Sequence, residues 1–297
     1  HLCKVPSTGW VQAVADIAVA VAQEKGLSAP LNGEATEIAK QIAKSLMAGE
    51  RRAVLLGNAA AHHPHASHLL TLSNWIADQT GAVVGYLSEA ANTVGAQLVG
   101  AMPGAGGLNA GQMLTGGLKA AILLNNEPEF DSAAGSNAVE SLGQCEMVVT
   151  LSPFKANMAC SDVLLPIAPF TETPGTFVNA EGRVQTFHAV VKPLGETRPA
   201  WKVLRALANV LNLPGFEFNS AQEVLEHLHV AKGGVVPDHV PANRLSNACA
   251  LPTSGLINSS VEPCVASIYQ LDGIVRRASA LQSTADASDS VKQEFAA

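Results

Sequence analysis

Apolar side chains recur every three or four positions along two segments near the start of the chain. Residues 10–25 have this spacing and are followed by Gly26, and residues 35–48 have it again and are followed by Gly49. The spacing places the apolar side chains on one face of a helix, and a glycine just past the last periodic residue commonly ends one. The pattern predicts two helices, over 10–25 and 35–48.

Short apolar runs of a different kind follow. They are apolar throughout rather than alternating with polar residues, as expected of parallel strands buried on both faces. The runs cover residues 53–57, 121–125, 147–151 and 163–168, and helical patterns closed by glycine cover 66–80 and 131–142. The succession of strands and helices predicts an open α/β fold, with a mostly parallel sheet and helices on both faces.

The pattern changes after Thr171. Two β-type stretches, 176–179 and 183–187, enclose a short loop that contains Gly182. Glycine readily adopts the left-handed backbone conformation that a hairpin loop of this length needs. We therefore predict a short β-hairpin here.

The last third of the chain has weaker patterns. Helices are predicted between Pro199 and Pro214 and over 221–229, whereas the sequence beyond about residue 232 is rich in Gly, Pro, Asn and Ser. These residues favour turns and irregular structure. We predict an α/β domain over residues 1–232 and an irregular C-terminal arm over 233–297.

The composition narrows the possible partners. Of the 297 residues, 47% are apolar and 14% are charged, and the formal net charge is −7. This balance excludes a disordered chain and argues against a nucleic-acid partner, which would require clustered Lys and Arg; Arg276 and Arg277 come closest. No apolar run reaches the roughly 18 residues of a membrane-spanning helix, and no signal peptide is recognisable, so we expect no direct membrane insertion.

The five cysteines do not have the spacing of a metal or cluster site. They are Cys3, Cys145, Cys160, Cys249 and Cys264. No pair forms a C-x-x-C motif, and no nearby base is placed to activate a thiol. We expect free, partly buried thiols in a reducing compartment.

Four histidines, His62, His63, His65 and His68, follow a predicted strand. Imidazoles can bind zinc or nickel, but Pro64 interrupts the helical spacing and no nearby cysteine or carboxylate completes a set of four ligands. We expect solvated or capping imidazoles at a strand-to-helix turn, with His65 and His68 on one face, and no metal.

Two further loops leave alternatives open. The glycines at 104, 106 and 107 resemble a phosphate-binding loop, but Asn109 stands where the dinucleotide fingerprint has its third glycine, which favours a flexible connection. Asn126 and Glu127 follow the end of a predicted strand, where α/β folds bind ligands, yet residues 126–129 could equally form an ordinary turn.

The strongest motif runs from residue 161 to 185. It combines a buried strand, an exit containing Pro166, an acidic turn and the predicted hairpin, which directs Asn179, Glu181 and Arg183 outward. Polar groups at the end of a parallel strand could hold an extended polar ligand. A well-capped hairpin at the edge of the domain would explain the same residues.

This motif resembles the signature of the molybdopterin oxidoreductase superfamily. The matching positions are Asp162, Leu165, Pro166, Glu172, Gly175, Thr176, Phe177, Asn179, Glu181, Gly182, Arg183 and Gln185. Within that superfamily, residues 55–96, 123–131 and 268–287 resemble the C-terminal part of the large iron–sulfur subunit of bacterial NADH:quinone oxidoreductase, respiratory complex I. The resemblance covers most of residues 50–287.

The resemblance implies a part without chemistry of its own. The iron–sulfur clusters of that subunit are bound by upstream cysteine motifs that this chain lacks, and the subunit keeps the fold without molybdopterin. Glu172, Gly175, Asn179 and Arg183 would then be inherited pterin-loop residues rather than a working site, with no catalytic residue in the chain. The implied role is structural, in the peripheral arm at the cytoplasmic face of the bacterial inner membrane. The expected partners are the other peripheral-arm subunits and the upstream part of the same subunit, contacted through residues 235–285.

Two alternatives remain. The chain could be a fragment of an active molybdopterin-dependent oxidoreductase, which predicts polar groups converging around Asn126, Glu172, Asn179 and Arg183. It could also be a nucleotide-binding module that uses the loop at 104–107, provided that this loop lies at a helix N-terminus on the carboxyl edge of the sheet.

Overall fold

The computed structural model describes residues 1–88, 90–231 and 266–288. These residues belong to two compact units, the first within residues 1–93 and the second formed by 94–231 and 266–288. The expected boundary at residue 232, residues 233–265 of the predicted arm, and residues 289–297 lie outside the described residues. No helix of the described part is long and apolar enough to cross a bilayer.

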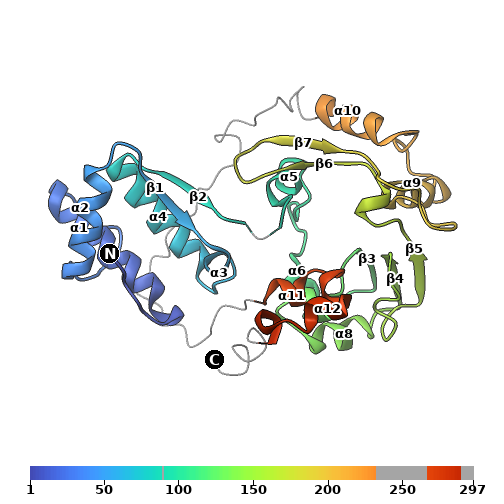
Figure 1. Ribbon diagram of the computed structural model, residues 1–297, viewed down its shortest axis with the longest axis horizontal. Helices are drawn as coiled ribbons and strands as arrows, with labels where there is room; N and C mark the ends of the chain where they lie inside the picture. Colours follow the sequence, from blue (N-terminus) through green and yellow to red (C-terminus); the bar gives the residue numbers. More distant parts are fainter. Residues whose placement is uncertain (89, 232–265, 289–297) are drawn as a thin grey trace. The chain divides into compact units, whose positions relative to one another are not determined.

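The first unit packs four α-helices and a short 3-10 helix with a two-stranded parallel sheet. Its elements are η1 (Ser7–Gly9), α1 (Trp10–Lys25), α2 (Glu37–Ala48), β1 (Ala53–Leu56), α3 (Asn58–Ala61), α4 (Ala66–Thr80) and β2 (Val83–Tyr86). Strand β1 pairs with β2 from Ala53↔Val83 to Leu56↔Tyr86. Helix α4 connects the two strands and packs against both of them and against α1 (Figure 1).

The bounds of the long helices follow from their end residues. Helices α1 and α4 end where predicted because Gly26, with φ 66°, and Gly81, with φ 73°, adopt the left-handed conformation that closes a helix. Helix α2 begins two residues later than predicted, because the Thr36 hydroxyl accepts the backbone N–H of Ala39 at 3.2 Å and caps it.

The core of the first unit is built from small and aliphatic side chains. Buried Ala15, Ala18 and Val21 of α1 belong to one cluster with Leu69 and Leu72 of α4. Alanine brings the helix backbones close together, which suits a chain with only 4% aromatic residues.

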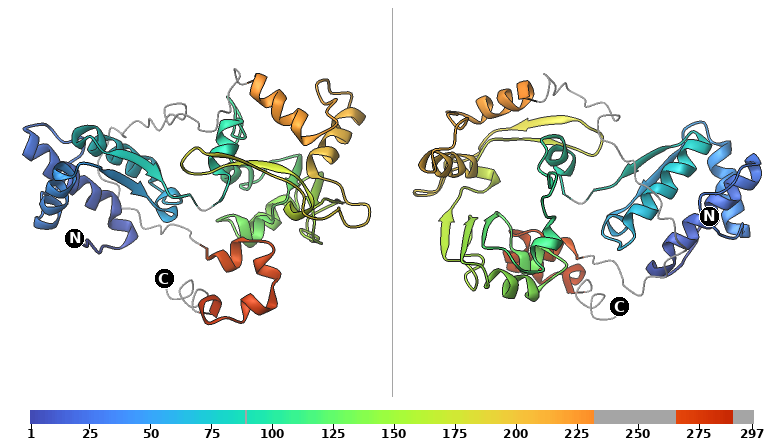
Figure 2. Two further views of the ribbon diagram at one scale, coloured as in Figure 1. Left: turned by 45° about the horizontal axis from the view of Figure 1, so that its top comes forward. Right: turned by 180° about the vertical axis from the view of Figure 1, so that it is seen from behind.

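The second unit contains a three-stranded parallel sheet in the order β3-β4-β5 and a separate hairpin, β6–β7 (Figure 2). Up to the hairpin its elements are α5 (Thr93–Leu98), α6 (Ala110–Met113), β3 (Ala120–Leu124), α7 (Pro128–Asp131), α8 (Ser136–Leu142), β4 (Met147–Ser152), β5 (Val163–Pro166) and η2 (Phe170–Glu172). The predicted α/β class, with parallel strands, flanking helices and an antiparallel hairpin, is confirmed.

The expectation that the strands are buried on both faces is wrong. The register places Ile122, Val149 and Val163 side by side on one face, and Ile122 is 55% exposed. The opposite face of β4 buries Val148 and Thr150. Leu151, on the same face as Val149, is fully buried, so this face is open at Ile122 and covered at the carboxyl end of β4. A run of apolar residues therefore did not indicate how far each face of the sheet is covered.

The helix predicted over 131–142 is also wrong in extent. It is divided into α7, which ends at Asp131, and α8, which begins at Ser136. Gly135 lies between them with φ 54°, a conformation that a continuous right-handed helix excludes. The break leaves Asp131 at the end of a short helix directly after β3.

The hairpin is confirmed as β6 (Gly175–Val178) and β7 (Val184–Phe187), with Gly182 at φ 82° in its loop. Helices α9 (Ala200–Val210) and α10 (Ala221–Ala231) follow, as predicted. Leu211, within the segment predicted as the first of these helices, follows its last residue and is exposed.

Residues 266–288 are not irregular, as the predicted arm would have been. They form α11 (Ile268–Leu271), η4 (Val275–Arg277) and α12 (Ser279–Gln282). This segment lies against the helices that follow β3, and α11 contacts α7 (Figures 1 and 2). The part of the chain that precedes the C-terminus is therefore integrated into the second unit.

Candidate functional site

The carboxyl ends of β3, β4 and β5 meet at one edge of the second unit, the edge at which open α/β sheets usually bind ligands. A cavity of about 230 Å³ lies there. It is lined by Asn125, Glu127, Asp131, Ser152, Pro153, Phe154, Pro169, Phe170, Leu271, Asp272, Gly273, Ile274 and Arg276. The lining therefore includes both the strand ends and the C-terminal segment of the chain.

Glu127 accepts hydrogen bonds from two arginines at this edge. Arg277 donates from Nη1 to Glu127 Oε1 at 2.7 Å and from Nη2 to Oε2 at 2.8 Å, and Arg276 donates from Nη2 to Oε1 at 2.9 Å. A guanidinium that bonds both oxygens of a carboxylate has the strongest geometry for such a pair. We call Glu127, Arg276 and Arg277 the latch.

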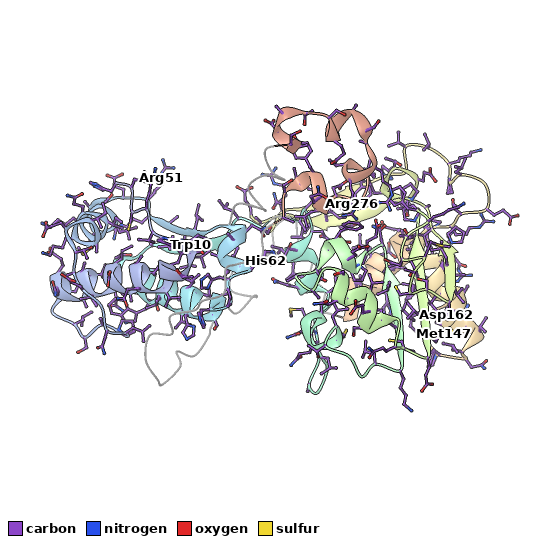
Figure 3. The ribbon with its side chains drawn as sticks, turned by 90° about the horizontal axis from the view of Figure 1, so that it is seen from below. Trp10, Arg51, His62, Met147, Asp162 and Arg276 are labelled. Carbon is purple, nitrogen blue, oxygen red and sulfur yellow. The ribbon has the colours of Figure 1, made fainter. Side chains whose placement is uncertain are left out.

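Other contacts hold the two arginines in place. Arg276 also donates to the carbonyl oxygen of Gln270 and lies 3.4 Å from Asp131 Oδ1. Its guanidinium stacks 4.5 Å from the Phe130 ring centroid, and that of Arg277 stacks 4.1 Å from the Phe154 ring. The Arg276 side chain is only 10% exposed, and Figure 3 marks it where the C-terminal segment meets the rest of its unit.

The local sequence explains how both arginines reach one carboxylate. Asp272 Oδ1 accepts the backbone N–H groups of Ile274 and Val275, each at 2.9 Å, and so begins the short helix η4. On the sheet side, Asp131 Oδ2 accepts the backbone N–H of Glu127 at 2.7 Å and fixes the turn after β3.

The latch keeps Glu127 ionised. The hydrogen bond from Arg277 lowers the pKa of Glu127 most, burial opposes it, and Arg276 lowers the pKa further. A carboxylate with both oxygens bonded to arginines has little basicity left for proton transfer. The latch therefore binds the C-terminal segment to the strand ends rather than providing a general base.

Side chains of the predicted pterin-loop residues accept hydrogen bonds within the hairpin region. Glu172 Oε2 accepts the backbone N–H of Leu194 at 2.9 Å, and Asn179 Oδ1 accepts those of Glu181 at 3.0 Å and Arg183 at 2.9 Å. These bonds shape the hairpin loop and the segment after it. Whether the same residues also face a ligand in the whole protein stays a prediction.

Gly175 is required by packing. A Cβ atom at this position would lie 2.4 Å from an atom of the Phe187 ring, which pairs with Gly175 across the hairpin. The Phe187 ring in turn meets Phe177 edge-on, with centroids 5.0 Å apart. Gly175 therefore makes room for this aromatic pair.

Among the described residues, no hydrogen bond or ion pair joins Asn126 to Glu172, Asn179 or Arg183. The Asn126 carbonyl oxygen instead accepts from Asn157 Nδ2 at 2.9 Å. The polar residues that converge at the strand ends are those of the latch. Asp162, at the start of the superfamily motif, accepts the Val148 backbone N–H at 2.7 Å and joins β5 to β4.

The histidines are less exposed than expected. His63 is 4% exposed and His68 is 9% exposed, so the expectation of solvated imidazoles is wrong for both. Within the described part of the chain there is no group of three or more His, Cys, Asp or Glu residues arranged to hold a metal ion.

The loop at 104–107 precedes a helix of a single turn, α6, and follows a helix rather than a strand. The side chains of Asn109 and Gln112 bond each other's backbone N–H, both at 2.9 Å, and so cap α6. The strand–loop–helix context of a phosphate-binding fingerprint is therefore missing at this loop.

Three cysteines are described, and all are free thiols, as expected: Cys3, Cys145 and Cys160. Burial raises the pKa of Cys160, and the nearby Cys145 and Asp162 raise it further. A raised pKa favours the unreactive thiol over the thiolate. Cys249 and Cys264 lie outside the described residues.

The sequence contained both halves of the latch but not their pairing. Glu127 was singled out as a residue after a strand end, at a ligand site or in an ordinary turn, and the two arginines only as the densest basic pair. The turn-forming residues Asp272 and Gly273 were the available indication that the arginines are held rather than solvated. The 149 and 150 positions that separate the partners exceed the range of any local pattern.

Comparison with known families identifies the family to which this α/β chain belongs. The profile of the family described as molybdopterin oxidoreductase matches residues 23–210, more than half of the chain. The chain belongs to the molybdopterin oxidoreductase family. The match includes the superfamily motif at 161–185 and ends within α9, so the C-terminal segment that contributes the two arginines lies beyond it.

Similar proteins of this family occur in Staphylococcus aureus under the name "Putative formate dehydrogenase". One, from strain bovine RF122, is 48% identical over 97 residues, which are 33% of this chain and 9% of that protein. Those from strains MRSA252 and USA300 are 37% identical over 68 residues and 44% identical over 59 residues, or 23% and 20% of this chain. These segments cover 7% and 6% of the two proteins, so this chain corresponds to a small part of each relative.

Membership of this family raises the question of whether the residues at the strand ends fit a nucleotide-extended pterin. The cavity of about 230 Å³ is smaller than the roughly 300–1,000 Å³ of typical small-molecule sites. Such a cofactor has anionic phosphates, whereas Glu127, Asp131 and Asp272 line the cavity and the arginines of the latch are already paired. With the C-terminal segment in place, these residues do not fit the cofactor.

Proposed function

We propose that this chain is part of an electron-transferring oxidoreductase of the molybdopterin family and that its redox centres belong to other parts of the protein. The match of the family profile over residues 23–210 is the main support.

One form of this function is a structural and assembly role in the large subunit of NADH:quinone oxidoreductase. The position of the chain's own C-terminal segment supports it, because this segment lies at the edge where open α/β sheets usually bind ligands. In this form the iron–sulfur clusters lie upstream, no molybdopterin is bound, and the neighbouring peripheral-arm subunits are the partners. The complex would attach peripherally at the cytoplasmic face of the membrane.

The other form is catalytic: a fragment of a molybdopterin-dependent oxidoreductase similar to formate dehydrogenases. The names of the staphylococcal relatives favour it over the structural role. It requires that residues 266–288 leave the strand ends, or that the rest of the protein supplies the cofactor site. The hairpin residues Glu172, Asn179 and Arg183 would then face the cofactor.

Metal and cofactor analysis of the whole protein, purified from its own cells, tests these two forms. Iron without molybdenum or pterin fluorescence, together with NADH:quinone activity, supports the structural role. Stoichiometric molybdenum and pterin with formate oxidation support the catalytic form and overturn the structural one. Absence of iron, molybdenum and pterin from an intact and active preparation would overturn the proposal as a whole.

A further inference from the structure

Four rings form a row in the first unit, where η1 and the start of α1 meet the beginning of α4. Trp10 stacks on His63 with ring centroids 5.8 Å apart, His63 lies 5.7 Å from His65, and His65 lies 5.1 Å from His68. Figure 3 marks Trp10 at one end and His62, which directly precedes the row in sequence. We call His63, His65 and His68 the histidine row.

The hydrogen bonds of His63 define its protonation state. Its Nδ1 accepts the backbone N–H of His65 at 2.9 Å, so this nitrogen has no proton. Its Nε2 lies 3.1 Å from the carbonyl oxygen of Ser7, which can only accept, so the proton is on Nε2. His63 is therefore neutral in this arrangement, and a second proton on Nδ1 would point at the N–H of His65.

The other two rings also favour the neutral state. His65 Nε2 and His68 Nδ1 are buried and have no hydrogen-bond partner. A proton on either nitrogen would add a buried donor without an acceptor, which is unfavourable. Burial lowers the pKa of His68, and the neighbouring His65 and His63 lower it further.

The surrounding elements provide no compensating carboxylate among the described residues. Asp16, the first acidic residue of α1, accepts from Gln12 Nε2 at 2.7 Å and from the backbone N–H of Glu34 at 2.8 Å. Arg52 is bound to the Thr80 carbonyl at the far end of α4. The remaining titratable groups on the elements that contact α1 and α4 and in the segments beside them are His1, Cys3, Lys4, Glu24, Lys25, Glu34, Glu37, Lys40, Lys44, Glu50, Arg51, His62, Asp78 and Tyr86.

We propose that the histidine row is an acid-sensitive clasp between residues 7–10 and the start of α4. Above neutral pH, His63 bridges the Ser7 carbonyl and the His65 backbone. A second proton on His63 ends the bond to His65 and places a positive charge next to two further imidazoles. The segment that contains Ser7 and Trp10 then separates from α4, whose own start loosens because it has no side-chain cap.

The direction of the pH response follows from linkage. In the closed state Nδ1 of His63 accepts the His65 N–H and leaves no room for a second proton, and burial lowers the pKa of His68. The closed clasp therefore binds fewer protons than the open form and is favoured above the ordinary histidine value of about 6.5. As the pH falls below this value, the open form gains up to about tenfold in population per pH unit for each proton taken up. The response is confined to acid conditions.

Hydrogen–deuterium exchange on the full chain tests the clasp. After correction for the intrinsic pH dependence of exchange, protection of peptides covering residues 7–14 and 63–70 should fall about tenfold between pH 7.5 and 5.5, while peptides from β4 and β5 should not change. Nitrogen NMR at pH 7.5 should show the proton of His63 on Nε2.

Matched variants separate the clasp from general acid destabilisation. His63→Asn keeps an acceptor for the His65 N–H but cannot titrate, so the acid response of residues 7–14 should shrink at least several-fold, whereas His62→Asn should retain it. An equal response in the His63→Asn chain, a His63 proton on Nδ1 at pH 7.5, or unchanged protection at pH 5.5 would each overturn the proposal. The last two measurements use the unaltered chain and do not depend on the variants folding.

Discussion

Arg277 forms two parallel hydrogen bonds to Glu127, a residue 150 positions earlier in the chain. With Arg276 on the same carboxylate, this pairing joins the C-terminal segment to the end of the first strand of the second sheet. The pair lies at the edge where related folds accept ligands. In this protein, a contact within the chain lies at that edge.

Glu127→Gln should release the C-terminal segment. The substitution leaves two arginines facing a neutral amide, and breaking a buried charge pair costs about 3–5 kcal/mol. Arg277 is about one-third exposed, so we expect a smaller loss of stability, about 2–3 kcal/mol. Limited proteolysis should cut residues 266–288 much faster, and Glu129→Gln, at an exposed position of the next helix, is the matched control. Unchanged proteolysis would show that the latch does not hold the segment.

Acid should release the C-terminal segment in the same way as Glu127→Gln. Because the pKa of Glu127 is lowered, mainly by Arg277, its contribution to stability is complete above the ordinary glutamate value of about 4.3. The contribution is lost as the pH falls through the lower value in the folded protein. Hydrogen–deuterium exchange at the backbone amides of residues 268–277 should therefore become faster below about pH 4 in the unaltered chain. The Glu127→Gln chain should not show this increase at low pH. The same increase in that variant would contradict the conclusion that Glu127 causes it.

Gly175→Ala should destabilise the hairpin. The added methyl group would meet the Phe187 ring at 2.4 Å, and overpacking of this kind costs about 1–3 kcal/mol. Gly104→Ala is the control, because a Cβ there meets nothing within 4 Å. The measurement is the urea concentration at the midpoint of unfolding, compared between the Gly175→Ala and Gly104→Ala variants. Equal midpoints would mean that the ring moves aside without loss.

Asn179→Ala should loosen the hairpin loop. The side-chain oxygen accepts two backbone N–H groups, those of Glu181 and Arg183, and both would lose their partner. The free energy of unfolding should fall by about 1–2 kcal/mol, because the turn is exposed. Asn179→Asp retains the acceptor and should preserve most of the stability. If alanine and aspartate behave alike in thermal unfolding, the loop does not depend on this acceptor.

The helices and the hairpin could be predicted because their determinants are local. Gly26 and Gly81 ended helices where the apolar spacing stopped, and Gly182 turned the hairpin. The undivided helix over 131–142 was wrong because a single residue, Gly135, outweighed favourable spacing on both sides. Four of the five parallel strands were found; β2 (Val83–Tyr86) was not predicted. The exposed side of Ile122 depends on which elements cover the sheet.

The site was harder to predict, since it depends on pairing across the chain. The superfamily motif drew attention to Glu172, Asn179 and Arg183, whose described bonds are local to the hairpin region. Glu127 and its arginine partners resemble ordinary surface charges until the fold brings them together. Similarly, the histidines were placed at the right turn, but their burial depends on η1, more than fifty residues earlier.

The 150-residue separation within the latch also sets an order of events during protein synthesis. Translation at about 5–20 residues per second produces Glu127 and its strand roughly 8–30 seconds before Arg277 exists. Throughout that interval the strand ends are open on the growing chain, and a chaperone or a small molecule can reach them without competing with the C-terminal segment. Once the C-terminal segment has left the ribosome, its two arginines bind Glu127 at this edge.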